Sequence, residues 1–249
     1  MLEVRDLSVP ATKNEPLSNI DFTAKSGEVM VVLGPNSSGK WQLLQTIVGQ
    51  IAHWQGKIKV NHYNLVTEPL KARGQIGYLS NPFVIDDYLT GYEYLELIGS
   101  SYHLSPKVRA QRIKLLAQAF DCSENLYTPA AHLTPDRVQL IGLIASLIHE
   151  PKVVVWSEPT ESIDYSNQKA LQLLLIDLRQ RDAIVIIATN NLEFAAAVAD
   201  TYLLLHDGQV IASGTLKQLA NQSGSSTDLV SVYESYYHFH DRRNNRLQA

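Results

Sequence analysis

The chain has 249 residues, 45% of them hydrophobic and 18% charged, and this composition excludes a wholly disordered protein. The formal net charge of −4 at pH 7 disfavours nucleic acid as the main partner. The only cysteine, Cys122, excludes an internal disulfide and fits a reducing compartment such as the cytoplasm.

The chain shows no sequence signal for export or for membrane insertion. Residues 1–6 lack a basic region followed by an apolar stretch, and the longest apolar segment, around Leu140 to Ile148, is about half of a membrane span. We therefore expect any association with a membrane to come through a partner.

Antiparallel strands are predicted near the start of the chain. Leu2, Val4 and Leu7 alternate with polar residues, and residues 56–60 form a second short alternating segment. Such alternation is typical of strands with one buried face.

A strand, a loop and a helix are predicted between these segments. Residues 29–33 are a continuous apolar run, as in a strand that is buried on both faces. The turn-rich residues 34–39 follow, and after them Leu43, Leu44 and Ile47 recur at helical spacing.

Helices are predicted through the middle of the chain. The pattern is helical from Thr90 to Phe120, with Ser105 as an N-cap and Pro106 at the first helical position. A further helix begins at residues 134–135 and ends before Pro151. We interpret these helices as an inserted subdomain.

The buried-strand pattern returns in the second half of the chain. It occurs at residues 153–156 and 184–188, and a helix is predicted around residues 168–181 between them. This alternation predicts an α/β fold with a parallel sheet and crossover helices.

The last part of the chain is predicted to contain a hairpin and a tail. Apolar residues 203–205 and 210–212 flank a turn at Asp207-Gly208. The tail, residues 221–249, is interpreted as a polar linker, a packing helix around residues 229–237 and a frayed terminus. Tyrosines at helical spacing predict a packing face on that helix, with use as an interface as the alternative; they are Tyr233, Tyr236 and Tyr237.

The turn after the first buried strand matches a phosphate-binding loop. Both glycines and the lysine of that pattern are present, but Trp stands where Ser or Thr is expected. Such a loop wraps backbone N–H groups around a phosphate, while its lysine bridges the β- and γ-phosphates of a nucleotide. A coincidental Gly/Ser turn is the alternative, but the strand before the loop and the helix after it favour nucleotide binding. The candidate nucleotide-binding residues are Gly34, Pro35, Asn36, Ser37, Ser38, Gly39, Lys40 and Trp41.

With this loop in place, nearly the whole chain resembles the ATPase subunits of ABC transporters. Residues 149–160 are similar to the family's Walker B segment, a hydrophobic strand that ends in Asp-Glu-Pro-Thr, and Asp164 stands at the D-loop aspartate. Residues 76–97 most resemble the ATPases of type-2 ABC exporters.

The resemblance implies a P-loop NTPase fold, in which a mixed sheet with crossover helices carries an antiparallel β subdomain and an inserted helical subdomain. The whole chain, residues 1–249, is then one nucleotide-binding domain. Its parts are a P-loop core with the β subdomain at 1–83 and 150–220, the helical subdomain at 84–149 and the C-terminal tail at 221–249.

Two magnesium-binding positions of the family carry other residues here. Trp41 has no hydroxyl to offer the cation, and Ser157 replaces the aspartate that holds its hydration shell. We expect ATP binding to be possible and magnesium binding to be weak. The eight histidines, His238 and His240 among them, show no spacing that suggests a metal cluster, so no metal site is predicted.

Three further motif positions of the family also differ. Asn81 stands at the Q-loop, where the family has a longer glutamine, and Asn190 replaces the switch histidine and cannot carry its charge. The signature helix begins with Thr134, Pro135 and Asp136, so it lacks one N–H and gains a negative charge where a phosphate would lie. The same three residues also make a sound helix N-terminus.

Glu158 remains as a candidate general base. Without the cation and the γ-phosphate contacts, a carboxylate has little transition state to act on, so hydrolysis is expected to be very slow or absent. An ion pair between Lys40 and Glu158 is the structural alternative for both residues. No aromatic residue occurs at residues 9–11, where the family stacks the adenine ring.

These departures favour a degenerate ATPase subunit of an ABC exporter, which binds nucleotide weakly or structurally and serves as a scaffold or regulator. The partners that the resemblance implies are an integral membrane permease subunit and a second ABC ATPase subunit, at the cytoplasmic face of the cell membrane. Two alternatives stay open: an atypical but active ATP-hydrolysing subunit, and a soluble nucleotide sensor or assembly factor without a transporter.

Overall fold

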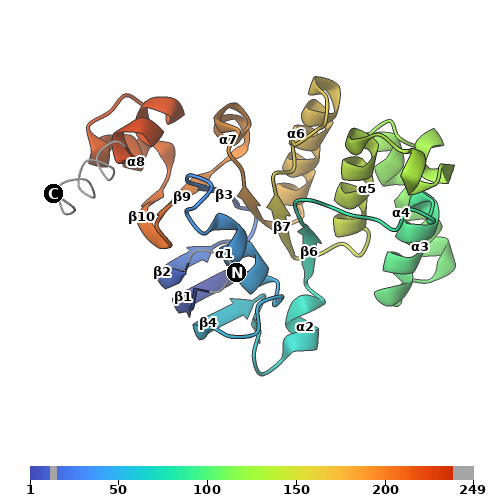
Figure 1. Cartoon of the computed structure of the whole chain (residues 1–249), viewed down its shortest axis with the longest axis horizontal. Coiled ribbons are helices and arrows are strands. Elements are labelled where there is room, and N and C mark those ends of the chain that lie inside the picture. Colours follow the sequence, from blue (N-terminus) through green and yellow to red (C-terminus); the bar gives the residue numbers. More distant parts are fainter. Residues whose placement is uncertain (12–15, 238–249) are drawn as a thin grey trace.

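A computed structural model of the chain describes residues 1–11 and 16–237. Two sheets lie one above the other, and most of the helices cover the outer face of the larger sheet (Figure 1). The frayed terminus predicted after Tyr237, with His238 and His240, lies outside the described residues.

The smaller sheet is antiparallel and has the strand order β2-β1-β4-β5. The two alternating segments of the sequence are its strands β1 and β4, so the prediction of antiparallel strands is confirmed. The strands are β1 (Leu2–Val9), β2 (Leu17–Ala24), β4 (Gln55–Val60) and β5 (Tyr63–Asn64).

The larger sheet is mixed, with the strand order β10-β9-β3-β8-β7-β6. Its strands pair in parallel except for the β9–β10 hairpin, which turns at Asp207-Gly208 as predicted. The sequence did not predict β6, because four residues that include Gly77 give too short a pattern. The strands are β3 (Val29–Leu33), β6 (Ile76–Leu79), β7 (Val153–Ser157), β8 (Ile184–Ala188), β9 (Thr201–His206) and β10 (Gln209–Gly214).

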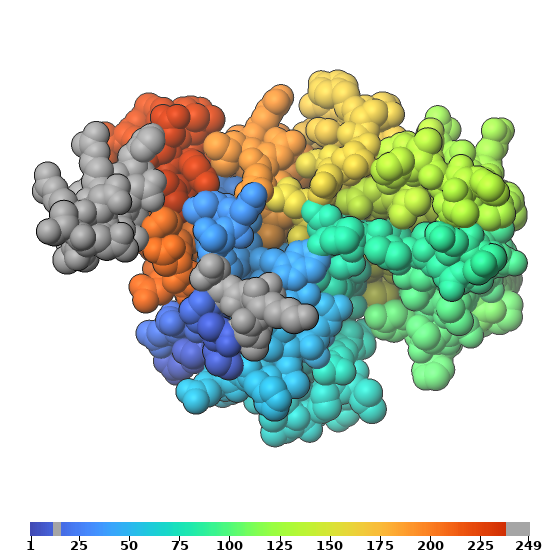
Figure 2. Space-filling view, viewed as in Figure 1, coloured from blue at the N-terminus to red at the C-terminus, as the bar shows by residue number. Residues whose placement is uncertain are grey.

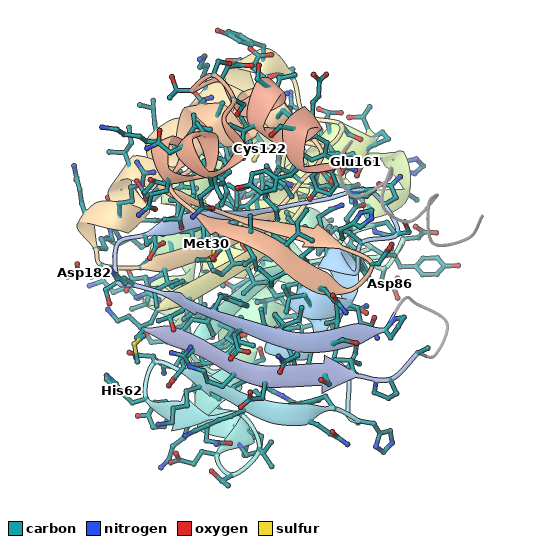
Figure 3. The ribbon with its side chains drawn as sticks, turned by 90° about the vertical axis from the view of Figure 1, so that its left-hand side faces the viewer. Met30, His62, Asp86, Cys122, Glu161 and Asp182 are labelled. Atoms are coloured by element: carbon teal, nitrogen blue, oxygen red, sulfur yellow. The ribbon has the colours of Figure 1, made fainter. Side chains whose placement is uncertain are left out.

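The central strands of this sheet point alternate residues into two different cores. In β3, Val29 and Val31 pack under the outer helices, whereas Met30 and Val32 face the smaller sheet. Figure 3 shows these layers side-on, with Met30 labelled between the sheets. The continuous apolar runs of the sequence follow from this arrangement, because neither face of the strands meets water.

The helices divide between the two cores. Helix α1 (Lys40–Ile47) lies in the core between the sheets, together with buried residues of β1 and β2. Helix α2 (Pro69–Arg73) packs beside β4 and β5. The outer core takes side chains from α5 (Pro135–Leu147), α6 (Tyr165–Gln180), α7 (Leu192–Val198), α8 (Leu216–Ser223) and the helical residues 229–237.

The helical region predicted in the middle of the chain forms one end of the molecule. Helix α3 (Gly91–Ser101) and helix α4 (Pro106–Ala119) pack against α5, with Ser105 as the N-cap that the sequence predicted. Figure 2 shows this green end opposite the red C-terminal segment. Two short 3-10 turns, Glu124–Tyr127 and Ala130–His132, join α4 to α5.

Two predicted boundaries were wrong, and local capping explains both. Helix α6 begins at Tyr165 because Asp164 caps it. The polar linker predicted from residue 221 overlaps helix α8, which starts at the capping box of Thr215 and Gln218 and ends at Ser223, where Gly224 takes the left-handed C-cap conformation. The predicted helix at residues 229–237 is confirmed. No helix among the described residues is both long enough and apolar enough to cross a bilayer.

Candidate functional site

The predicted phosphate loop joins the end of β3 to the start of α1, and the backbone passes so close to its neighbours that glycine is required. Gly39 has a φ of 89°, and a Cβ atom there would lie 2.6 Å from Cδ2 of Leu17. A Cβ atom on Gly34 would lie 2.3 Å from the carbonyl oxygen of Leu205. Any other residue at either position would displace the loop.

The Lys40 side chain folds back inside this loop. It is 7% exposed, and its ammonium donates to the carbonyl oxygen of Pro35 at 2.9 Å and to that of Gly34. Burial lowers the pKa of Lys40 to about 8, and the negative charge of Glu158 opposes that shift. A cation is therefore held where the charge of a bound phosphate would stabilise it.

Two buried polar side chains, one in the loop and one just after it, have no hydrogen-bond partner among the described residues. Ser38 is 0% exposed and its Oγ is unpaired, and Gln42, at 1% exposure, leaves both amide atoms unpaired. An unpaired buried polar group costs about 1–3 kcal/mol, so such groups point to a missing ligand or water. The loop thus fits the phosphates of a nucleotide. Gln42 was not singled out by sequence because its role shows only in its burial.

Glu158 follows β7 and turns its carboxylate toward the segment after β8. Oε2 accepts from Thr189 Oγ1 at 2.7 Å, and Oε1 accepts from the Asn190 N–H at 2.9 Å. Burial raises the pKa of Glu158, and these two hydrogen bonds oppose that shift. A direct ion pair between Lys40 and Glu158, the structural alternative for both residues, is absent among the described residues, because both groups take nearer partners.

Asn190 closes the site from the side of β8. Its Nδ2 donates to Asn36 Oδ1 at 2.9 Å, which joins the predicted switch residue to the phosphate loop. Asn36 and Asn190 both line a cavity of about 340 Å³. Its lining residues are Pro35, Asn36, Thr189, Asn190, Leu192 and Tyr233.

Comparison with known proteins decides the family. Residues 17–161 match the ABC transporter family. The chain belongs to the ABC transporter ATP-binding family. It is 29% identical to the ABC-type transporter ATP-binding protein EcsA of Bacillus subtilis (strain 168), over 90% of this chain and 91% of EcsA.

Solved structures give the same fold. A structure titled as the ATP-binding subunit of an ABC transporter has a TM-score of 0.89 and 28% identity, covering 95% of this chain and 99% of that one. The dimeric ATP-binding cassette MJ0796, in a post-hydrolysis state with ADP and Pi, has a TM-score of 0.76 at 19% identity, with 86% and 98% coverage. The predicted mixed-sheet ABC ATPase fold is confirmed.

Magnesium, which ABC ATP-binding subunits use with ATP, does not fit the residues at its two expected positions. Trp41 presents a partly buried indole that has no oxygen ligand. Ser157 is 4% exposed and offers a neutral hydroxyl in place of a carboxylate. Within residues 1–11 and 16–237, no group of three or more His, Cys, Asp or Glu residues is arranged to hold a metal ion.

Asn81 and Asp164, at the predicted Q-loop and D-loop positions, form hydrogen bonds outside the phosphate loop. The Asn81 amide donates to the carboxylate of Glu161. Asp164 accepts from the Asn167 N–H at 2.8 Å and so caps α6. Neither hydrogen bond reaches the phosphate loop.

Helix α5 begins at the predicted signature position, with Thr134, Pro135 and Asp136. Thr134 is its N-cap and makes no side-chain cap hydrogen bond, and Pro135 is the first helical residue. Asp136 pairs with Arg137 at 3.3 Å. One turn later Gln139 donates to the carbonyl oxygen of Glu158 at 3.1 Å, a link between α5 and the site that sequence reasoning missed.

An aromatic side chain does lie near the expected adenine position, but it comes from another loop. A cavity of about 550 Å³ is lined by Val9 and Pro10 together with Trp54, which precedes β4. Leu17 lines the same cavity and also packs against Gly39, so this cavity lies next to the phosphate loop. This ring could not be found from the sequence, because Trp54 is far from residues 9–11 along the chain.

Proposed function

We propose that this ABC ATP-binding subunit holds ATP through its phosphate loop, gains little from magnesium, and hydrolyses the nucleotide very slowly or not at all. One contrast supports the proposal. The loop keeps its glycines, its buried Lys40 and an unpaired Ser38 hydroxyl, whereas Trp41 and Ser157 remove both expected ligands of the cation. Phosphoryl transfer depends on charge stabilisation, so losing the cation costs far more rate than affinity.

We further propose that the chain works in an exporter complex of the type-2 kind, as one nucleotide-binding domain with the helical subdomain at residues 84–149. A membrane permease and a second ATPase subunit would be its partners, on the cytoplasmic face. In a head-to-tail pair, each composite site uses the loop of one chain and the signature helix of the other. Pro135 and Asp136 make this chain a weak donor of that helix, so we favour a scaffold or regulatory role.

One observation favours an active enzyme as the second candidate. The carboxylate of Glu158 is oriented by two hydrogen bonds, and burial raises its pKa, as suits a general base. If the purified chain shows ATP turnover, the Glu158→Gln variant decides its origin. Turnover that disappears in this variant belongs to the chain, and turnover that persists comes from a contaminant.

The proposed function is tested by calorimetric titration of ATP with and without magnesium. We expect binding in both conditions with closely similar affinity, and we expect the Lys40→Ala variant to lose it. Binding that requires magnesium would refute the account of Trp41 and Ser157. If ATP does not bind in either condition, the loop has no nucleotide function.

A further inference from the structure

The helix at residues 229–237 reaches the strand that leads into the phosphate loop. Tyr237, at 7% exposure, places its Oη 3.1 Å from the carbonyl oxygen of Leu33 and 3.0 Å from that of Leu205. Leu33 directly precedes Gly34 in the chain. One phenolic proton therefore serves two strand ends, β3 and β9, at the entry to the loop.

The same contact bears on the geometry of Gly34. The Leu205 carbonyl oxygen that accepts from Tyr237 is also the atom that a Cβ on Gly34 would approach to 2.3 Å. The position of this oxygen therefore limits the path of the first loop residue. If loss of the Tyr237 hydroxyl lets the Leu205 carbonyl move, the space available to Gly34 changes directly, because no side chain lies between them.

A second tyrosine of this helix lines a cavity next to the loop. Tyr233 packs on Tyr237 with ring centroids 4.2 Å apart, and it lines the cavity of about 340 Å³ together with Pro35, Asn36 and Asn190. Asn190 also donates its backbone N–H to Glu158. The cavity therefore lies between the loop and the segment that orients the candidate base, and the Tyr233 ring forms one wall of it.

We propose that the helix at residues 229–237 is part of the nucleotide site, with Tyr237 as a positioning residue for the phosphate loop and Tyr233 as a wall of the cavity in front of it. The inference rests on the proposed function, because it requires the loop to bind phosphates. Tyr236, between them, points elsewhere: its hydroxyl donates to Leu219 and Gln222 of α8. Tyr236 therefore offers a matched control on the same helix.

The experiment uses the full chain and the variants Tyr237→Phe and Tyr236→Phe. Each is titrated with tripolyphosphate, which probes the loop without a nucleobase, and each is unfolded by heat to measure stability. The backbone amide resonances of Gly34, Ser38 and Gly39 report loop geometry directly. We expect Tyr237→Phe to weaken tripolyphosphate binding roughly three- to tenfold and to shift these resonances. Tyr236→Phe should do neither, whatever its effect on stability.

Tyr233 is tested by a second pair of variants. Tyr233→Ala opens the cavity wall and should weaken tripolyphosphate binding, whereas Tyr233→Phe keeps the ring and should bind as the wild-type chain does. Equal binding by all three chains would refute the role of the wall.

Two results for Tyr237 would overturn the inference. One is unchanged affinity with unchanged loop resonances in Tyr237→Phe, and the other is an equal loss in Tyr236→Phe, which would mean general loosening of the helix. If the wild-type chain binds neither tripolyphosphate nor ATP, the proposed function fails and the inference fails with it. Normal ATP binding with no effect of Tyr237→Phe refutes the inference alone.

Discussion

The lowered pKa of Lys40 predicts that ATP binding weakens within the range of ordinary buffers. Burial favours the neutral amine, so Lys40 loses its proton around pH 8 rather than above pH 10. At pH 7 about nine tenths of the free chain carries the charged ammonium, and at pH 9 about one tenth does. If only the charged form binds, the affinity for ATP falls about tenfold over this range, or about 1.4 kcal/mol.

The assay is calorimetric titration of ATP at half-unit steps from pH 7 to pH 9. A phosphate ester with a second pKa of about 6 gains negative charge as the pH rises, so titration of the terminal phosphate cannot cause a fall in affinity. Lys40→Arg is the control, because a guanidinium keeps its charge at every pH tested. We expect a flat profile for Lys40→Arg and a falling one for the wild-type chain. A flat wild-type profile, or an equal fall in Lys40→Arg, would refute the assignment of the binding charge to Lys40.

Three further predictions concern magnesium binding, stacking of the adenine ring and the pH dependence of stability. The double variant Trp41→Ser with Ser157→Asp should bind ATP at least about tenfold more tightly with magnesium than without, by calorimetry, and no gain would count against our account of the defect. Trp54→Ala should weaken ATP binding roughly tenfold and leave tripolyphosphate binding unchanged, whereas Trp54→Phe retains both; equal ATP affinity in all three chains would exclude stacking on this ring. His149 stacks on Tyr102, and burial lowers its pKa to about 4. Because the folded protein holds the neutral imidazole, His149 makes its full contribution to the free energy of unfolding above about pH 6.5. As the pH falls to 4, up to about 3 kcal/mol of that free energy is lost. Urea unfolding of His149→Phe should therefore depend less on pH between 4 and 6.5 than that of the wild-type chain, and parallel curves would contradict this.

The local elements were predictable wherever one short-range signal dominated. Continuous apolar runs identified β3 and β8 with their observed bounds, and Ser105 with Pro106 marked the start of α4. Prediction failed where the signal was a side-chain cap in polar sequence, as at Thr215 for α8, or where the strand was very short, as in β6. Hydrophobic patterns carry no information about such caps.

Some residues of the candidate site could likewise be predicted from local sequence, and others could not. The phosphate loop has a local signature, so residues 34–41 were found by spacing alone, and the resemblance added Glu158 and Asn190. The unpaired amide of Gln42 and the link from Gln139 to Glu158 depend on burial and on contacts between distant segments. No spacing rule in the sequence encodes them.

By itself the sequence determined that the chain has a phosphate-loop pattern on an α/β fold, with an indole at Trp41 and a neutral hydroxyl at Ser157 where the family has a hydroxyl and a carboxylate. It determined this because residue type and local spacing are enough to define a loop and its ligands. Only the tertiary structure decided that Lys40 bonds to the loop rather than to Glu158, and that Tyr237 ties the end of the chain's last described helix to the strand before the loop. Those outcomes depend on which of several competing partners lies within hydrogen-bonding distance once the sheets and helices are packed.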